Sequence, residues 1–373
     1  MSLALYRKYR PKQFKEILGQ SELVAVLENA ARRNKLAHAY LFYGPRGTGK
    51  TTAARIIAKV ANCGTRARDE KFRAKGEPCN TCRPCMEIDR GQALDVVEID
   101  AASNRGIDEI RSLKESIRLS PTSYAYKVFI IDEAHQLTKE AWNALLKTLE
   151  EPPAHAIFIL ATTEYEKVPA TIASRTQRFH FKKPSLPEIQ GKLTDIVRQE
   201  HLKVTDDALE LIAASADGSF RDAESLLDQL SSLSEEVTIE IVEGMVGKIG
   251  FARVAELADL ILKKDLTGSL EFIRVLSDGG ANMVDVVKEL IGYLRRVLTL
   301  SLDSQFMNYF KKELTDRECK KIQEHSTLIT PEVHIPLIKA LISAWSDTRY
   351  SPFASIPLEV AVIEHLKLKK TRL

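Results

Sequence analysis

The chain has 373 residues, enough for two or three domains that each bury a core of their own. Hydrophobic residues make up 44% and charged residues 28%, which is ordinary for a globular protein and does not indicate intrinsic disorder. The chain has 54 Lys and Arg and 51 Asp and Glu, so its net charge is only +3. This net charge does not by itself indicate nucleic-acid binding.

The N-terminal stretch "MSLALYRKYRPKQFK" is basic but lacks the apolar run of a signal peptide. No segment approaches the roughly 18 apolar residues of a membrane span. We therefore expect a cytoplasmic protein without a membrane segment. In a reducing cytoplasm, a tight cysteine cluster favours a metal site over disulfides.

Five short apolar runs alternate with helical stretches over the first half of the chain. One of these helical stretches, 138–150, places Ala141, Leu145 and Leu149 on one face. The alternation predicts an α/β fold with a five-stranded parallel sheet covered on both faces. The expected strands are 39–43, 95–100, 126–132, 156–161 and 178–181.

The pattern changes at "KKPSLPE", 182–188, where Ser185 and Glu188 predict a capping box. No strand is expected after this point. The segment 185–246 predicts about three short helices with a break at Gly218, and 247–373 carries long amphipathic patterns typical of a helical bundle. We therefore expect domains at 1–181, 182–246 and 247–373.

The stretch "GPRGTGKT" matches G-x-x-x-x-G-K-[ST] between an expected strand and an expected helix. In that context its backbone N–H groups and the helix N-terminus predict a phosphate cradle, in which Lys50 reaches the β- and γ-phosphates and Thr51 holds Mg²⁺. A Gly-rich turn that matches by chance is the competing interpretation. The expected ATP-binding residues of this loop are Gly44, Pro45, Arg46, Gly47, Thr48, Gly49, Lys50, Thr51 and Thr52.

Two further apolar runs end in polar side chains at the expected sheet edge. "VFIIDEAH" places Asp132 there to bind Mg²⁺ and Glu133 to polarise the attacking water. "LATTE" adds Thr163, which either bonds the γ-phosphate or water, or caps a turn. An acid pair after a strand is alone commonly a solvated cap, but the phosphate loop upstream favours catalysis.

Four of the five cysteines, Cys63, Cys79, Cys82 and Cys85, predict a metal site. The C-x2-C-x2-C spacing of the last three, with fifteen residues between Cys63 and Cys79, suits tetrahedral zinc. The alternatives are an iron–sulfur cluster or coincidental thiols, and redox switching is a minor one. A closed set of four thiolates predicts a structural site that stabilises the insertion at about 63–85, which has little apolar content.

In this order the motifs resemble the AAA+ ATPases, and the cysteine insertion narrows the resemblance to the gamma/tau ATPases of the bacterial DNA polymerase III clamp loader. The resemblance covers about the first 230 residues. Beyond them only length and helicity agree. The stretches that carry it include "RPKQFKEILGQ", "HAYLFYGPRGTGKTT", "EIDAASN", "IIDEAHQL", "NALLKTLEEPP", "LATTE", "SRT" and "GSFRDAESLLDQ".

The resemblance implies further nucleotide contacts. It matches Arg221 to the lid arginine that contacts phosphates in cis, and Arg175 to the arginine finger offered to a neighbouring subunit. The family usually reads Ser-Arg-Cys where this chain has Thr176. Tyr6, Arg10 and Pro11 match the segment that lies beside the base and ribose. Each of these charged groups could otherwise be a solvated surface residue.

The resemblance also implies partners and an activity. It predicts an ATP hydrolase of the DNA polymerase holoenzyme that joins other clamp-loader subunits in a pentameric ring through its helical collar, with a three-helix lid. The ring would load a sliding clamp on primer–template DNA, contacting the DNA backbone from Ser103, Asn104 and Arg105. The alternatives are an AAA+ motor or helicase, and a clamp-loader scaffold that does not hydrolyse ATP.

Overall fold

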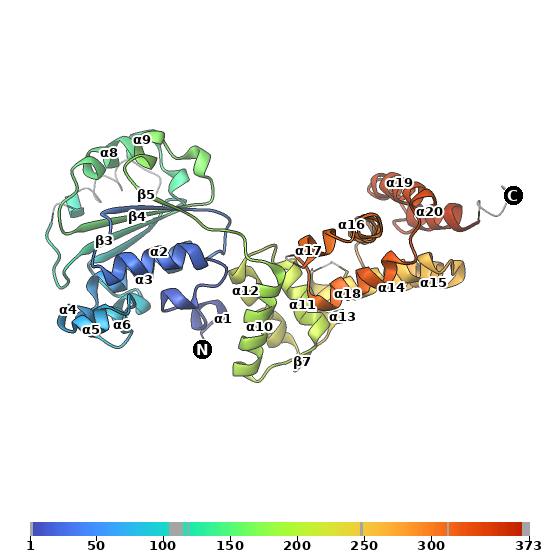
Figure 1. Cartoon of the computed structure of the whole chain (residues 1–373), viewed down its shortest axis with the longest axis horizontal. Coiled ribbons are helices and arrows are strands. Elements are labelled where there is room, and N and C mark those ends of the chain that lie inside the picture. Colours follow the sequence, from blue (N-terminus) through green and yellow to red (C-terminus); the bar gives the residue numbers. More distant parts are fainter. Residues whose placement is uncertain (1–2, 104–114, 118, 247–248, 312, 368–373) are drawn as a thin grey trace. The chain divides into compact units, whose positions relative to one another are not determined.

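The computed structural model describes residues 3–103, 115–117, 119–246, 249–311 and 313–367 (Figure 1). These form two compact units, one of residues 1–184 with 218–221 and one of residues 185–217 with 222–373. Each unit buries hydrophobic cores of its own. Among the described residues, no helix has the length and apolar character needed to cross a membrane.

The first unit contains a five-stranded sheet in the order β2-β3-β4-β1-β5, and every pairing is parallel. All five predicted apolar runs form strands, which confirms the predicted α/β class. The strands are β1 Ala39–Tyr43, β2 Val96–Asp100, β3 Lys127–Asp132, β4 Ala156–Thr162 and β5 Gln177–His180.

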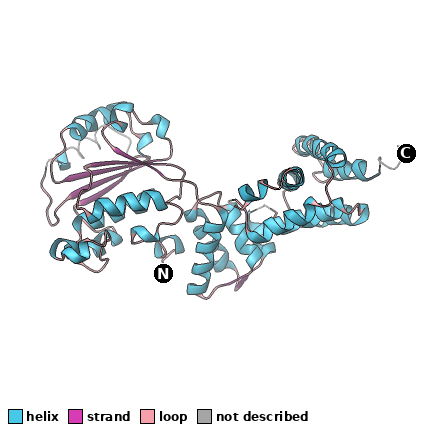
Figure 2. Ribbon diagram, viewed as in Figure 1, coloured by secondary structure: helices cyan, strands magenta, loops and turns pink. Residues whose placement is uncertain are grey.

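Helices cover both faces of this sheet (Figure 2). Tyr40 and Phe42 of β1 pack in a core with α2 (Ser21–Arg32) and α3 (Lys50–Asn62), whereas Leu41 packs on the other face with α8 (Lys139–Glu150) and α9 (Ala170–Ala173). This alternation is the period of two expected for a strand that is buried on both sides. The other described helices of the unit are α1 Leu5–Lys8, η1 Phe14–Glu16, α4 Gly64–Arg68, α5 Glu70–Arg73, α6 Arg83–Arg90, η2 Ala134–Gln136 and η3 Tyr165–Lys167.

The register of the sheet brings the carboxyl ends of its strands to one edge. Tyr43 pairs with Thr162, and Asp100 pairs with Asp132. Loops that follow these strands therefore meet at that edge, which is where open parallel sheets bind ligands.

The second unit begins at the predicted capping box. The Ser185 side chain accepts the Glu188 N–H, and the Ser185 N–H donates to Glu188 Oε2 at 2.8 Å. The segment to 246 differs from the expectation in two respects. It holds four helices rather than about three, since the apolar stretch with Ile239 and Val242 buried forms a further helix, and it contains a two-residue parallel ladder that was not expected. Its elements are α10 Leu186–Glu200, β6 Lys203–Val204, α11 Asp206–Ser215, α12 Phe220–Leu233, β7 Glu236–Val237 and α13 Ile239–Val246.

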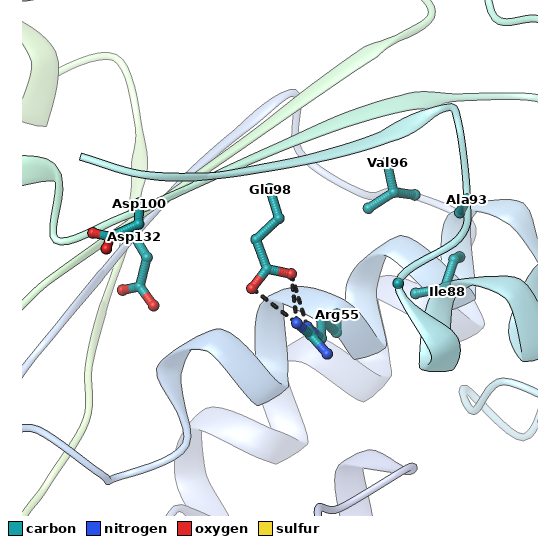
Figure 3. Close-up of a pocket in the computed structure, with 8 residues that line it drawn as sticks. Arg55, Ile88, Ala93, Val96, Glu98, Asp100 and Asp132 are labelled. Atoms are coloured by element: carbon teal, nitrogen blue, oxygen red, sulfur yellow. Dashed lines mark hydrogen bonds and ion pairs between the residues drawn. The ribbon is translucent and has the colours of Figure 1, made fainter. Parts of the chain in front are cut away.

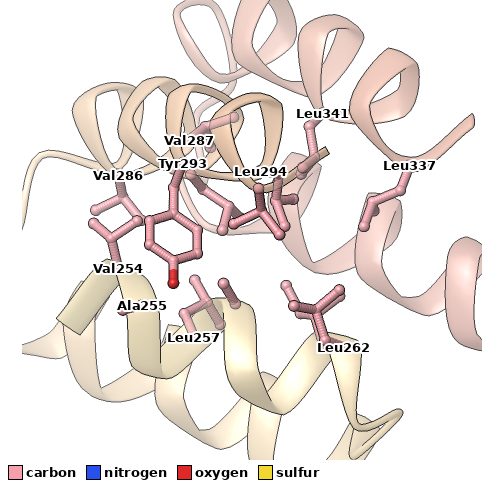
Figure 4. Close-up of a cluster of buried hydrophobic side chains, with 14 of the residues drawn as sticks. Val254, Ala255, Leu257, Leu262, Val286, Val287, Tyr293, Leu294, Leu337 and Leu341 are labelled. Carbon is pink, nitrogen blue, oxygen red and sulfur yellow. The ribbon is translucent and has the colours of Figure 1, made fainter. Parts of the chain in front are cut away.

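The remainder of the second unit is helical, as its amphipathic patterns predict. Apolar faces of α14, α16 and α19 meet in one core (Figure 4), where the Tyr293 hydroxyl is hydrogen-bonded to His325 Nδ1 at 2.7 Å. The hydroxyl thereby keeps a partner although its ring is buried. The helices are α14 Phe251–Leu262, α15 Leu266–Asp278, α16 Met283–Leu302, α17 Phe306–Phe310, α18 Asp316–Ser326, α19 Pro331–Thr348 and α20 Ile356–Lys367.

Two carboxyl groups lie close together inside the second unit, and we expect them to make its stability depend on pH. Burial, and next the nearby Glu318 carboxyl, raise the pKa of Glu210 from 4.5 to about 8, while Arg317 opposes the shift and Asp207 adds to it. The folded state therefore keeps a proton that the unfolded chain loses above pH 4.5. The free energy of unfolding should fall as pH rises from about 4.5 to about 8, by at most about 1.4 kcal/mol per pH unit.

Replacing Glu210 with glutamine should remove this slope and raise the melting temperature at pH 8 and above, because the amide is neutral at every pH. Thermal melts of the two proteins between pH 6 and pH 9 measure it. The matched control is Glu235→Gln, an exposed position, which should keep the wild-type slope. If the melting temperatures of wild type and Glu210→Gln changed with pH by the same amount across this range, the prediction would be contradicted.

Candidate nucleotide site and cysteine cluster

The phosphate loop joins β1 to α3 and needs its glycines for conformation and for space. Gly44 and Gly49 have positive φ angles of 141° and 100°. A Cβ at Gly44 would lie 2.2 Å from the carbonyl oxygen of Phe181, so no other residue fits there. The thirteen-residue helix α3 begins at Lys50, and its unpaired N–H groups face the loop. The sequence context predicted for a phosphate cradle is therefore present.

Lys50 is buried, with 6% of its surface exposed, and its ammonium is held by the loop itself. Nζ donates to the carbonyl oxygens of Gly44 at 2.8 Å and Pro45 at 2.7 Å. Burial lowers its pKa, and the carboxylates of Glu133 and Asp132 oppose that shift. The Lys50 ammonium therefore lies in the loop within electrostatic range of the Asp132 and Glu133 carboxylates. A triphosphate needs such a cation, and its metal counterion needs such carboxylates.

Thr51 and Asp132 meet although 81 positions separate them, because α3 begins and β3 ends at the same sheet edge. The Thr51 hydroxyl donates to Asp132 Oδ2 at 2.7 Å. A carboxylate and a hydroxyl side by side are hard oxygen donors of the kind that Mg²⁺ takes together with phosphate oxygens and water. These residues fit the predicted magnesium role.

Glu133 lies at the same edge in the left-handed region, with φ of 48°. Its Oε2 accepts the Thr163 hydroxyl at 3.0 Å and lies 3.4 Å from His135 Nδ1. Residues held in this region without being glycine store about 1–3 kcal/mol and cluster at functional sites. Thr163 thus contacts the predicted base, a contact that the sequence did not predict, and its expected bond to the γ-phosphate or the water stays a prediction. The sequence analysis gave His135 no role, although its position two residues after Glu133 in "DEAH" could have indicated a contact with that carboxylate.

The segment 218–221 lies against the phosphate loop. The Phe220 N–H donates to the Gly47 carbonyl at 3.3 Å, and a Cβ added at Gly47 would fall 1.9 Å from the Ser219 hydroxyl. Arg221 lies with its guanidinium 5.2 Å from the centre of the Tyr6 ring, a cation–π contact. The structure therefore brings the predicted Arg221 and Tyr6 together beside the loop.

Arg10 lies in the same neighbourhood. It is partly buried, within electrostatic range of Tyr6, Arg221, Arg55 and Glu98. Pro11 follows it and is half-buried. Tyr6, Arg10 and Pro11 remain predicted neighbours of the base and ribose.

A cavity of about 570 Å³ opens beside Asp132 between β2 and α3 (Figure 3). Arg55 of α3 crosses it and donates from Nε and Nη2 to the two carboxylate oxygens of Glu98, each at 2.9 Å. Such a two-pronged pair fixes both partners in orientation. It ties the helix that starts at Lys50 to the edge strand of the sheet, and neither residue was singled out from the sequence.

Arg175 lies at the end of α9, 35% exposed at its side chain. Nη2 pairs with Glu150 Oε1 at 2.8 Å, and Nη1 donates to the Thr171 carbonyl at 2.8 Å. A planar guanidinium near the surface can reach a neighbouring subunit, and the arginine-finger role of Arg175 stays a prediction. Ser103 donates to Asp100 Oδ2 at 3.2 Å, while Asn104 and Arg105 lie outside the described residues.

The four predicted cysteines converge at the end of α3. All four sulfurs lie within 4.8 Å of one another, and Cys82 Sγ lies 3.9 Å from Cys63 Sγ. Thiolates about 2.3 Å from a tetrahedral zinc ion lie about 3.8 Å apart. Backbone N–H groups of Cys79 and Cys82 point at sulfur, at 3.4 and 3.2 Å. The geometry fits a metal ion held by four sulfurs.

The acidity of the cluster agrees with this geometry. A hydrogen bond from the Cys85 thiol, aided by the N–H groups of Arg66 and Cys79, lowers the pKa of Cys63 to about 4. The same contact, together with burial, raises the pKa of Cys85. The lowered pKa of Cys63 favours its thiolate, which is the form that binds metal. No pair of the described cysteines forms a disulfide.

Comparison with known proteins matches three consecutive segments of the chain to families of DNA polymerase III subunits. Residues 19–185 match the family model for the DNA polymerase III delta subunit, 188–235 that for the ATPase lid domain of the DNA polymerase III clamp loader subunit, and 237–371 that for domain III of DNA polymerase III subunits gamma and tau. The DNA polymerase III subunit gamma of Buchnera aphidicola is 34% identical over 323 residues, which cover 86% of this chain and 84% of that protein. The chain belongs to the gamma/tau family of DNA polymerase III subunits.

Longer members of the gamma/tau family are also similar to the chain. DNA polymerase III subunit tau of Bacillus subtilis is 40% identical over 97% of this chain but 62% of its own length, and subunit tau of Escherichia coli is 37% identical over 80% of this chain and 45% of its own. The chain thus spans less than two thirds of these relatives. The predicted family and the AAA+ fold class, with lid and helical third domain, are confirmed.

Solved structures at lower identity are similar in part. The Bacillus subtilis clamp loader delta protein is 14% identical with a TM-score of 0.42, covering 92% of this chain and 99% of that one. The Thermotoga maritima RuvB branch migration motor is 20% identical with a TM-score of 0.44, covering 63% and 70%. At these scores neither likeness bears on the function of this gamma/tau chain.

Proposed function

We propose that the chain is an ATPase subunit of a DNA polymerase III clamp loader, which couples ATP binding and DNA-stimulated hydrolysis to loading of a sliding clamp on primer–template DNA. The observation that carries this proposal is the meeting of Lys50, Thr51, Asp132 and Glu133 at one sheet edge in a gamma/tau family member. We further propose that it works in a pentameric ring with related subunits in the cytoplasm, as part of the polymerase holoenzyme.

The residues of the site take the following roles. The loop from Gly44 to Thr52 and the N-terminus of α3 bind the phosphates through backbone N–H groups, and Lys50 exchanges two carbonyl partners for phosphate oxygens. Thr51 and Asp132 hold magnesium, which supplies charge neutralisation between the phosphates. Glu133 orients and deprotonates the attacking water, and Thr163 fixes the Glu133 carboxylate.

Three further groups extend the site. Arg221 contacts the phosphates in cis from its position beside Tyr6, and Arg175 reaches the nucleotide of a neighbouring subunit. Tyr6, Arg10 and Pro11 border the base and ribose. Ser103, Asn104 and Arg105 contact the DNA backbone, which predicts binding that depends on salt more than on sequence. The four cysteines hold zinc in a structural role.

The division into domains follows these roles. Residues 1–181 bind the nucleotide, 182–246 form the lid and 247–373 form the collar that assembles the ring. Large apolar side chains that are exposed on α16, α17 and α20, and in the segment between α19 and α20, are the groups that we propose for the assembly surface. They are Leu302, Phe306, Tyr309, Tyr350, Phe353, Ile356 and Val360.

The test combines the purified chain with its partner subunits, a sliding clamp and primed DNA. ATP-dependent phosphate release should rise on adding clamp and primed DNA together, with labelled clamp becoming topologically linked to circular DNA. Strand displacement without clamp loading would instead indicate an AAA+ motor, and clamp loading without phosphate release from this subunit would indicate a scaffold.

A further inference from the structure

The segment 10–17, here called the strap, lies between the phosphate loop and the cysteine cluster. Ile17 Cγ2 is 3.7 Å from where a Cβ at Gly49 would stand, so the strap packs directly on the loop. Phe14 is fully buried in the core that also holds α3. Arg10 at its start is within electrostatic range of Arg221 and Tyr6. The strap thus forms one wall of the proposed nucleotide site.

The strap is held from its other side by the cysteine insertion. Glu77, two positions before Cys79 and 8% exposed, accepts the Phe14 N–H at 2.8 Å and the Lys15 N–H at 3.0 Å. Both carboxylate oxygens are therefore used on strap backbone. Hydrogen bonds to a charged acceptor are stronger than those between neutral groups.

Lys59 makes a second connection from within α3. It is 1% exposed, and its ammonium donates to the Lys12 carbonyl of the strap at 3.1 Å and to Asn80 Oδ1 at 2.8 Å, and pairs with Asp89 at 2.8 Å. A buried lysine needs all such partners, since removing one leaves a charge uncompensated. The ammonium joins the strap, the C-x2-C turn and α6.

Both connections depend on the shape of the cysteine turn. Asn80, between Cys79 and Cys82, has a positive φ of 60°, and the turn is closed by N–H groups that point at the Cys79 sulfur. The insertion has little apolar content, so a metal ion bound by the four sulfurs would fix the turn that carries Asn80, and with it Glu77 two positions before Cys79. Loss of the ion would release both contacts to the strap.

We propose that the metal-loaded cysteine cluster is energetically coupled to the nucleotide site, with Glu77 and Lys59 as positioning residues that hold the strap on the phosphate loop. The inference rests on the proposed function in that it takes ATP as the ligand. Coupling of this kind is reciprocal: metal strengthens nucleotide binding, and nucleotide raises the affinity for the metal by the same factor.

The first experiment uses the wild-type chain and reads the metal, not activity. Zinc transfer to a coloured chelator is followed with and without a slowly hydrolysed ATP analogue plus Mg²⁺. We expect nucleotide to lower the fraction of zinc released at a fixed chelator concentration, with the apparent zinc affinity raised about fivefold or more. An unchanged zinc affinity in a chain that calorimetry shows to bind ATP overturns the inference and leaves the proposed function standing.

The second experiment uses variants that keep the four cysteines. Glu77→Ala removes both acceptors and should weaken ATP binding about fivefold or more, whereas Glu77→Gln keeps one acceptor oxygen and should fall in between. Zinc content near one per chain shows that the cluster still loads. The matched control is Glu70→Gln on the same insertion, 88% exposed, which should bind ATP as wild type does.

The outcomes separate the two proposals. Equal ATP affinity for wild type, Glu77→Gln and Glu77→Ala at full zinc loading overturns the inference. If Glu77→Ala fails to fold, the wild-type zinc experiment decides by itself. If zinc-loaded wild type did not bind ATP, both the proposed function and the proposed coupling would be contradicted.

Discussion

Replacing Arg175 with alanine should slow ATP hydrolysis in the assembled ring about 10³- to 10⁵-fold, the range seen when an arginine finger is removed. The guanidinium is planar and near the surface, so it can meet charge that develops on the γ-phosphate of a neighbouring subunit. Because the contact is made in trans, the variant chain alone should bind ATP with wild-type affinity. Phosphate release with clamp and primed DNA, and calorimetry on the isolated chain, measure the two effects.

Two variants calibrate that result. Arg178→Ala removes an exposed arginine of β5 that bonds the Tyr165 hydroxyl, and it should change hydrolysis less than about threefold, as a surface contact worth about 0–1 kcal/mol predicts. Glu150→Gln frees Arg175 from its ion pair and should have a similarly small effect. Arg175→Ala that hydrolyses like Arg178→Ala would refute the arginine finger.

Replacing Glu133 with glutamine should lower the rate of hydrolysis about 10²- to 10⁴-fold, the contribution of a general base. The amide keeps the size of the side chain and can still take the Thr163 hydrogen bond, so ATP binding should persist. Single-turnover hydrolysis and ATP calorimetry separate these effects. The variant should also hold the ring in its ATP-bound arrangement, with the clamp open and unreleased.

The control for this prediction is Glu166→Gln, an exposed carboxylate in η3 behind the same sheet edge. It should hydrolyse ATP within about twofold of wild type, since surface carboxylates contribute little. If Glu133→Gln retained wild-type turnover, Glu133 would be a strand-end cap, the competing interpretation of its sequence.

Local sequence patterns were enough to predict the strands of the sheet and the meeting of the phosphate loop with Asp132 at its edge. A phosphate loop between a strand and a helix, and an acidic pair at a strand end, must meet because parallel strands end at one edge. The contact of Thr51 with Asp132 follows from that rule alone. The cysteine cluster could also be predicted from the sequence, because a C-x2-C turn by itself places its two sulfurs close together.

Other parts of the site depend on packing between distant segments, which no local pattern reports. Lys59 and Glu77 look like ordinary solvated charges in the sequence, yet both are buried against the strap. The Arg55 pair with Glu98 and the position of His135 beside Glu133 arise in the same way. The two-residue ladder of β6 and β7 escaped notice because so short a run has no period.

Gly47 occupies a position that the phosphate-loop motif leaves unrestricted, yet here it is as constrained as the glycines the motif requires. Its φ of 72° and the Ser219 hydroxyl in the space of its absent side chain restrict that position to glycine. Positions 47 and 219 should therefore change together during evolution. A family member with a larger residue at the first would need either a smaller one at the second or a lid that has given up this anchor.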